Sequence, residues 1–169
     1  MSNQSIRRSQ SIYPYGPGAI IDQGQESFVV LDIFRNRKAW DNRKQIIRLE
    51  RLEYHLDCPG GFRAPPIKET GQVNGILVQR FPSWLFCPNC RRMYKWNRKE
   101  EIENDEKAPI CKSESCEQII LVPMRFVAAC ENGHLEDIDW RFWAHQNSSQ
   151  SKGVCAKEVS DLRFITDSK

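Results

Sequence analysis

Short apolar runs separated by turn residues predict strands in the first half of the chain. Residues 19–21 and 28–31 are apolar and flank a turn of glutamine and glycine, which is typical of two paired strands. A third short run at 76–78 predicts another strand and leads into an aromatic turn before the first cysteine pair.

A helical pattern lies between these strands. Apolar residues recur at helical spacing across 46–56, with charged residues between them. Asp41 or Asn42 can cap this helix, and the Cys-Pro-Gly-Gly run at 58–61 can end it.

The second half alternates charged and apolar segments. Residues 95–109 are highly charged and predict an exposed insertion. Apolar runs at 119–122 and 125–129, separated by a proline, predict two strands. A helix is expected over 137–146, beginning near Asp137.

These elements indicate an α+β fold, a small mixed domain with a zinc-ribbon-like four-cysteine module and a second zinc site of cysteine and histidine. We expect an N-terminal α+β segment over 1–80, the zinc-ribbon-like module over 81–130, and a helix and loop carrying the second site over 131–169. The three segments can also form one compact domain.

Composition narrows the class of protein. An apolar fraction of 40% with 10% aromatic residues argues against a disordered chain. The sequence contains no run of 18 apolar residues, so it predicts no membrane span, and its N-terminus shows no secretory signal. The net charge of +3 is too small to indicate nucleic acid by itself.

The seven cysteines bear on compartment and chemistry. Their number is odd and no secretory signal precedes them, so we expect a cytoplasmic protein whose thiols stay reduced. In that setting, closely spaced cysteines favour metal binding over disulfides.

The strongest chemical pattern is a set of four cysteines spaced C-x2-C-x20-C-x4-C. The set consists of Cys87, Cys90, Cys111 and Cys116. Two pairs of thiolates give the tetrahedral sulfur set that Zn²⁺ accepts, and four protein ligands indicate a structural site. The alternative is four buried thiols with no common ligand.

A second set combines cysteine and histidine. It consists of Cys130, His134, His145 and Cys155. A set of two cysteines and two histidines suits Zn²⁺. In the alternative interpretation, His134 is a turn residue and His145 is a histidine at a helix end.

Clustered basic residues are candidates for contact with DNA phosphates. They are Arg7, Arg8, Arg35, Arg37, Lys38, Arg91 and Arg92. Solvated surface is the simpler interpretation of each cluster. Trp140 and Trp143 could stack on bases, although their spacing is more typical of one buried helix face.

Little in the sequence indicates an enzyme. No Walker A, GxGxxG or GxSxG pattern is present. Glu136, Asp137 and Asp139 form an acidic run that more simply caps the following helix. A metal-dependent hydrolase using these aspartates with His134 and His145 is the enzyme alternative, and we expect a non-catalytic protein.

Several separated motifs resemble the DrmB proteins of the bacterial DISARM anti-phage system. They are the segments 7–10, 15–22, 81–90 and 121–145. Tyr15 stands where the family pattern leads us to expect phenylalanine. Family members are several times longer, so the resemblance implies the N-terminal part of a longer protein.

The resemblance also implies partners. DrmB-type proteins work as accessory subunits beside a helicase-like subunit, DrmA, in a DNA-engaging defence complex. We therefore expect a helicase-associated, zinc-binding protein that contributes to DNA engagement, with no role at a membrane. A stand-alone nucleic-acid-binding zinc module is the alternative.

Overall fold

The structure is a computed structural model that describes most of the chain. The described residues are 7–36, 46–65, 76–105, 107–146 and 161–166. The chain divides into two compact units, Met1–Ile21 with Phe28–Gln79 and Asp22–Ser27 with Arg80–Lys169.

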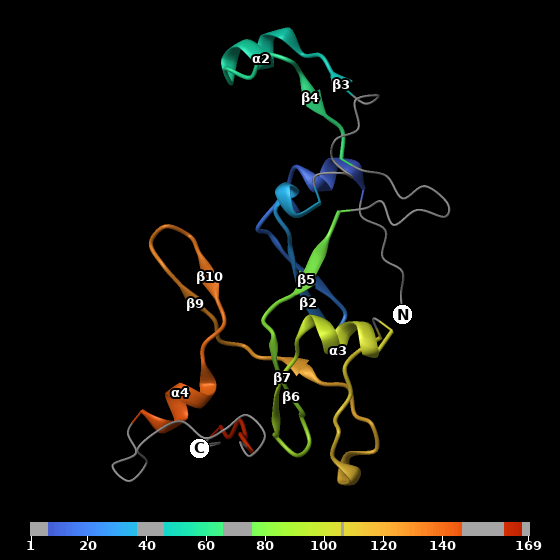
Figure 1. Cartoon of the computed structure of the whole chain (residues 1–169), viewed down its shortest axis with the longest axis vertical. Helices are drawn as coiled ribbons and strands as arrows, with labels where there is room; N and C mark the ends of the chain where they lie inside the picture. Colours follow the sequence, from blue (N-terminus) through green and yellow to red (C-terminus); the bar gives the residue numbers. More distant parts are fainter. Residues whose placement is uncertain (1–6, 37–45, 66–75, 106, 147–160, 167–169) are drawn as a thin grey trace. The chain divides into compact units, whose positions relative to one another are not determined.

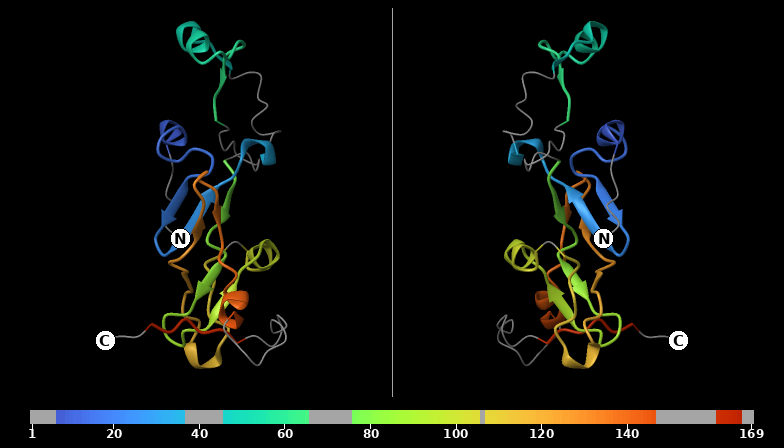
Figure 2. Two further views of the ribbon diagram at one scale, coloured as in Figure 1. Left: turned by 90° about the vertical axis from the view of Figure 1, so that its left-hand side faces the viewer. Right: turned by 90° about the vertical axis from the view of Figure 1, so that its right-hand side faces the viewer.

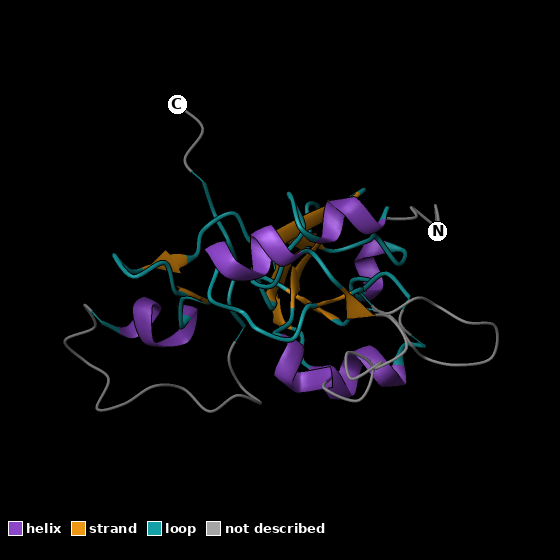
Figure 3. Cartoon of the chain, turned by 90° about the horizontal axis from the view of Figure 1, so that it is seen from above, coloured by secondary structure: helices purple, strands orange, loops and turns teal. Residues whose placement is uncertain are grey.

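Short helices and strands build both units (Figure 1; Figure 3). The helical elements are η1 (Arg8–Ser11), η2 (Ile33–Asn36), α2 (Glu50–His55), α3 (Arg98–Glu103), η4 (Glu114–Cys116) and α4 (Trp140–His145). The strands are β1 (Ile20–Gln23), β2 (Glu26–Val30), β3 (Ile46–Ile47), β4 (Phe62–Arg63), β5 (Val78–Arg80), β6 (Trp84–Phe86), β7 (Met93–Lys95), β8 (Val122–Pro123), β9 (Ala128–Ala129) and β10 (Leu135–Glu136). This mixture confirms the predicted α+β class.

Two of the predicted strands are confirmed in β1 and β2, which form a three-stranded sheet with β5 in the order β1-β2-β5. Val30 exchanges backbone hydrogen bonds with the preceding segment, receiving one from Gly18 at 2.8 Å and donating one to Ala19 at 2.9 Å. Val30 is buried, so this apolar run contributes a side chain to the hydrophobic core as well as backbone hydrogen bonds. The predicted strand at 76–78 is shifted, because β5 begins at Val78.

The helix expected to end at residue 56 is shorter than predicted. It begins at Glu50, and the apolar pair Ile46–Ile47 forms strand β3 against β4 instead. Gly61 explains the strand: its φ is +84°, and a Cβ there would approach the Ile47 carbonyl oxygen to 2.8 Å. The predicted caps Asp41 and Asn42 lie outside the described residues.

The second unit is organised around strand β6, which pairs with β7 on one side and β8 on the other (Figure 2). All three of its residues are buried. Leu85 packs with the cysteine cluster on one face, whereas Trp84 and Phe86 pack with Met124 on the other. This alternation places the cysteines directly on a hydrophobic core.

The charged segment at 95–109 contains a helix that the sequence analysis did not predict. Asn97 caps α3 by accepting from the amides of Lys99 and Glu100, and the Glu100 side chain accepts from the Asn97 amide. Glu101 of this helix pairs with the buried guanidinium of Arg80 at 2.8 Å. Helix α3 is therefore anchored by an ion pair to Arg80, the last residue of β5.

The later predicted elements are shorter than expected. Helix α4 begins at Trp140, and its cap is Asp139, which accepts from the amides of Arg141 and Phe142. Asp137 is therefore not the start of the helix as predicted. Its carboxylate instead accepts from the Ser83 amide at 2.9 Å and from the Ser83 hydroxyl at 2.6 Å.

Residues 161–166 run along the outer edge of β7. The Met93 amide donates to the Leu162 carbonyl at 2.8 Å, and the Phe164 amide donates to the Arg91 carbonyl at 2.8 Å. Arg92 and Arg163 form an antiparallel bridge between these bonds. This segment therefore pairs with the residues at the start of β7 through one isolated bridge.

None of the described helices has the length and apolar character needed to cross a membrane.

Candidate metal centre

The first cysteine pair is shaped by the hairpin that joins β6 to β7. Cys87 follows β6 directly, and its amide donates to the Arg92 carbonyl at 2.9 Å. The Arg91 amide returns a bond to the Cys87 carbonyl at 3.0 Å, with Arg91 at a φ of 63°. This tight turn places Cys87 and Cys90 on one side of the hairpin.

The second pair comes from the segment that follows α3. The Cys111 amide donates to the Ile119 carbonyl at 2.8 Å, which closes a loop around the 3₁₀-helix η4 that carries Cys116. Glu117, directly after this helix, has a φ of 42° and turns the chain back. The wider x4 spacing of this pair is therefore filled by one helical turn.

The four sulfur atoms lie close enough together to share one ion. The Sγ atoms of Cys87 and Cys116 are 3.8 Å apart, and those of Cys90 and Cys111 are 3.7 Å apart. All four lie within 4.8 Å of one another. With zinc–sulfur bonds of about 2.3 Å, a tetrahedron has edges of about 3.8 Å. The donor set and its spacing therefore fit a tetrahedral thiophilic metal ion.

Burial makes a cation at this point favourable. Cys87, Cys111 and Cys116 are buried, and Cys90 is half-buried beside them. Thiolates in such a setting need compensating charge, because removing an anion from water is costly. A divalent cation bound by all four thiolates supplies that charge.

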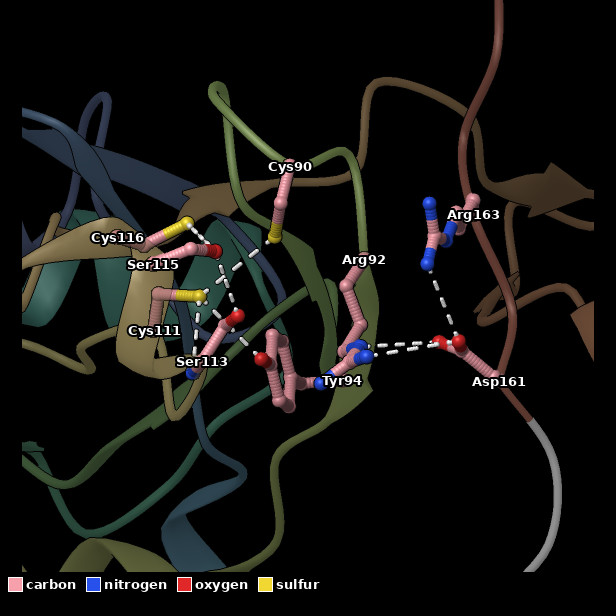
Figure 4. Close-up of polar contacts among 9 residues, drawn as sticks. All are labelled: Cys90, Arg92, Tyr94, Cys111, Ser113, Ser115, Cys116, Asp161 and Arg163. Carbon is pink, nitrogen blue, oxygen red and sulfur yellow. Dashed lines mark hydrogen bonds and ion pairs between the residues drawn. The ribbon is translucent and has the colours of Figure 1, made fainter.

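Polar groups around the cluster point at the sulfur atoms (Figure 4). The Tyr94 hydroxyl lies 3.3 Å from Cys111 Sγ, and the Asn89 amide nitrogen donates to Cys116 Sγ at 3.6 Å. The Ser113 amide donates to Cys111 Sγ at 3.5 Å. Such donors spread the negative charge of metal-bound thiolates. No sequence pattern marked these residues as neighbours of the sulfur atoms, although all of them lie within four positions of a cysteine.

The thiols differ in acidity. Burial raises the pKa of Cys90 to about 12 and also raises the pKa of Tyr94 to about 12. Burial acts in the same direction on Cys116, but hydrogen bonds from Cys90, Ser115, Cys87 and Cys111 outweigh it and lower the pKa of Cys116 to about 6. Cys116 is therefore a stronger acid than Cys90.

The sequence matches a family described as a domain of unknown function, DUF8724, over residues 7–169. The chain belongs to this family. It is also 28% identical over 145 residues to the DISARM protein DrmB of Bacillus paralicheniformis. That similarity covers 79% of this chain and 23% of DrmB, so the chain spans about a quarter of the relative's length. The expected relationship to DrmB-type proteins is confirmed.

Half of the second predicted metal set is brought together in this DUF8724 chain. Cys130 Sγ lies 3.2 Å from His134 Nδ1 in the β9–β10 hairpin. His145 instead has its Nδ1 2.6 Å from the Arg141 carbonyl oxygen on α4, and Cys155 lies outside the described residues. Across the described ranges, the one group of three or more metal-ligating side chains is the four-cysteine cluster.

Two predicted DNA-contact residues make contacts within the second unit. The Arg91 guanidinium lies 5.2 Å from the Phe86 ring and donates to the Phe164 carbonyl at 2.7 Å. Arg92 pairs with Asp161 at 2.9 Å. Both arginines hold residues 161–166 against β7.

The other predicted contacts lie in the first unit. Arg7 precedes η1, in which Arg8 lies, and Arg35 is exposed in η2. Arg37 and Lys38 lie outside the described residues. Contact of any of these residues with DNA stays a prediction.

Aromatic side chains lie on the surface of the second unit. Trp140 is half-buried and packs against Phe126 with ring centroids 6.3 Å apart. Trp143 is 62% exposed, and its neighbour Phe142 is exposed as well. Helix α4 therefore presents aromatic side chains to solvent. The expectation that both tryptophans lie on one buried helix face is wrong, because Trp140 is half-buried and Trp143 is exposed.

Proposed function

We propose that the four-cysteine cluster binds one Zn²⁺ and that the chain is a non-catalytic accessory component of a DISARM-like anti-phage defence complex. The observation that supports the metal is the sulfur spacing of 3.7 and 3.8 Å at the buried cluster. The observation that supports the role is the similarity to DrmB across 79% of the chain.

Zinc is the metal that this donor set favours. Four thiolates in tetrahedral array select Zn²⁺ or iron among the common ions. Zinc requires no redox partner, and with four protein ligands it has no open position for water, which is the arrangement of a structural site. Elemental analysis separates the two metals directly, and an iron site would also be coloured.

The proposed partner is a helicase-like subunit of the DrmA type. Support comes from the four sequence motifs shared with DrmB proteins and from the similarity to DrmB itself. In this proposal the zinc-bound unit provides a rigid surface for the partner. DNA engagement would involve the exposed basic residues, of which Arg35 is the clearest in the structure.

A stand-alone nucleic-acid-binding module is the second candidate. It is favoured by the solvent-exposed rings of Phe142 and Trp143 on α4, because exposed aromatic rings can stack on unpaired bases. Its expected signature is DNA affinity without any partner and a steep loss of that affinity with salt.

Co-purification with a DrmA-type subunit tests the proposal. We expect the zinc-loaded chain to co-elute with the subunit in size-exclusion chromatography and to bind DNA weakly when alone. Cys87→Ser should abolish co-elution, whereas Cys58→Ser, at an exposed cysteine of the other unit, should not. Strong salt-sensitive DNA binding by the isolated chain, with no co-elution, would favour the second candidate.

A further inference from the structure

Strands β9 and β10 form a hairpin (Figure 1). Cys130 and His134 lie in the turn between them. The Cys130 amide donates to the His134 carbonyl at 3.1 Å, and the Gly133 amide donates to the Cys130 carbonyl at 2.9 Å. Gly133 has a φ of 79°, which a side chain would disfavour. Two backbone hydrogen bonds across the turn therefore define its geometry.

This turn resembles the Cys87–Cys90 turn in three respects, although the two loops differ in length. In both hairpins the first ligand residue directly follows a strand, Cys87 after β6 and Cys130 after β9. In both, a left-handed residue adjoins the second ligand residue, Arg91 after Cys90 and Gly133 before His134. In both, the amide of the first cysteine closes the hairpin by bonding to a carbonyl across it.

The donor atoms of the two side chains in this turn lie close together. Cys130 Sγ and His134 Nδ1 are 3.2 Å apart. Zinc bonds of about 2.3 Å to sulfur and about 2.0 Å to nitrogen place tetrahedral donors about 3.5 Å apart. An opening of a few tenths of an ångström would therefore seat both donors on one ion. Both residues are exposed, so an ion can reach them from solvent.

We propose that Cys130 and His134 form a second metal-binding point, separate from the four-cysteine cluster, that binds a borderline-soft divalent cation such as Zn²⁺. A thiolate and an imidazole are two of the ligands that tetrahedral zinc prefers. The remaining positions on the ion are open to water or to a further ligand.

Cobalt titration of the full chain tests this proposal. Co²⁺ reports tetrahedral sulfur and nitrogen ligands through its visible absorption, and metal analysis gives the number of ions bound. We expect about two ions per chain at saturating Co²⁺, one at the cluster and one at the hairpin.

Variants at the turn provide the decisive comparison. Cys130→Ser and His134→Ala should each lower the count to about one ion per chain and leave the absorption of the four-cysteine cluster unchanged. His134→Cys keeps a ligand at that position and should retain the second ion with a shifted spectrum. Cys58→Ser is the matched control, since Cys58 is exposed but lies in the other unit.

Two results would overturn the inference. One is a single ion per chain in the unmodified protein at saturating Co²⁺. The other is a second ion that persists in both Cys130→Ser and His134→Ala. Because both substitutions lie at exposed positions, circular dichroism should show an unchanged fold in either variant.

Discussion

The second unit has two hairpins that carry potential metal ligands, and their turns are similar but their surroundings differ. The β6–β7 hairpin belongs to a three-stranded sheet and lies on a hydrophobic core that includes Leu85, Trp96 and Leu121. The β9–β10 hairpin has two residues in each strand, and all four are exposed. A turn alone can therefore bring two potential metal ligands together, whereas a structural metal site needs a hydrophobic core beneath the turn as well.

The difference extends to the atoms around the ligands. Tyr94, Asn89, Ser113 and Ser115 lie against the sulfurs of the four-cysteine cluster. The donor atoms of Cys130 and His134, in contrast, face each other on an exposed turn. We therefore expect tight, slowly exchanging metal at the first hairpin and weaker, faster exchanging metal at the second.

Removing metal from the four-cysteine cluster should have the largest effect. Structural zinc contributes about 10–16 kcal/mol of apparent binding free energy, which in such sites is also folding free energy. A strong chelator, or Cys116→Ser, should therefore unfold much of residues 81–124, seen as a loss of circular dichroism and of the thermal transition. An unchanged melt after verified metal loss would contradict the structural role and erase the contrast between the hairpins.

Asp137 links the two hairpins, because it follows β10 and bonds to Ser83 just before β6. Asp137→Ala leaves the half-buried Ser83 amide without its carboxylate and should destabilise the second unit by about 2–3 kcal/mol, measured by urea unfolding. Asp139→Ala removes the cap of α4 and is the matched control, with an expected cost of about 1 kcal/mol. Equal costs would argue against Asp137 as the link.

Tyr94→Phe tests whether the polar groups around the sulfurs strengthen the first hairpin. Loss of the hydroxyl near Cys111 Sγ should lower stability by roughly 1 kcal/mol and speed metal transfer to a chelator about 10-fold. Tyr54→Phe is the control, because Tyr54 is exposed on α2 in the other unit. Identical transfer rates in the two variants would show that the hydroxyl does not support the site.

Gly133→Ala should have the smallest effect on stability. A Cβ at this position meets no atom within 4 Å, so the cost is confined to the left-handed backbone, roughly 1 kcal/mol. We expect an unchanged global melting temperature and weaker Co²⁺ binding at Cys130 and His134. Gly133→Asn should bind Co²⁺ better than Gly133→Ala, since asparagine tolerates positive φ. A lowered global melt would mean that the second hairpin supports the fold.

Local spacing predicted the cysteine cluster, because cysteines separated by two residues share a turn. The C-x2-C pair is such a case, and the structure brings all four predicted cysteines together. The connection between Cys90 and Cys111 was harder to predict, because the highly charged residues 98–103 form a helix without an obvious apolar face. The Asn-x-x-Glu capping box at Asn97 and Glu100 was the signal that could have found it.

Long-range pairing accounts for the errors. Ile46 and Ile47 fit a helical spacing, but pairing with Phe62 and Arg63 makes them a strand, and no local pattern reveals that partner. Asp137 fitted the pattern of a helix cap, yet its partner Ser83 lies 54 positions earlier in the chain. Contacts of this kind depend on the tertiary arrangement and leave no trace in neighbouring residues.

The short segment 161–166 has a consequence for behaviour in concentrated solution. An uncovered β-strand edge is a template on which other polypeptides can add strands, leading to aggregation. Leu162 and Phe164 bond to the backbone of Met93, the first residue of β7, and of Arg91 just before it, and the Arg91 guanidinium donates to the Phe164 carbonyl. The segment therefore leaves fewer free backbone groups on this side of the hairpin for another polypeptide to pair with.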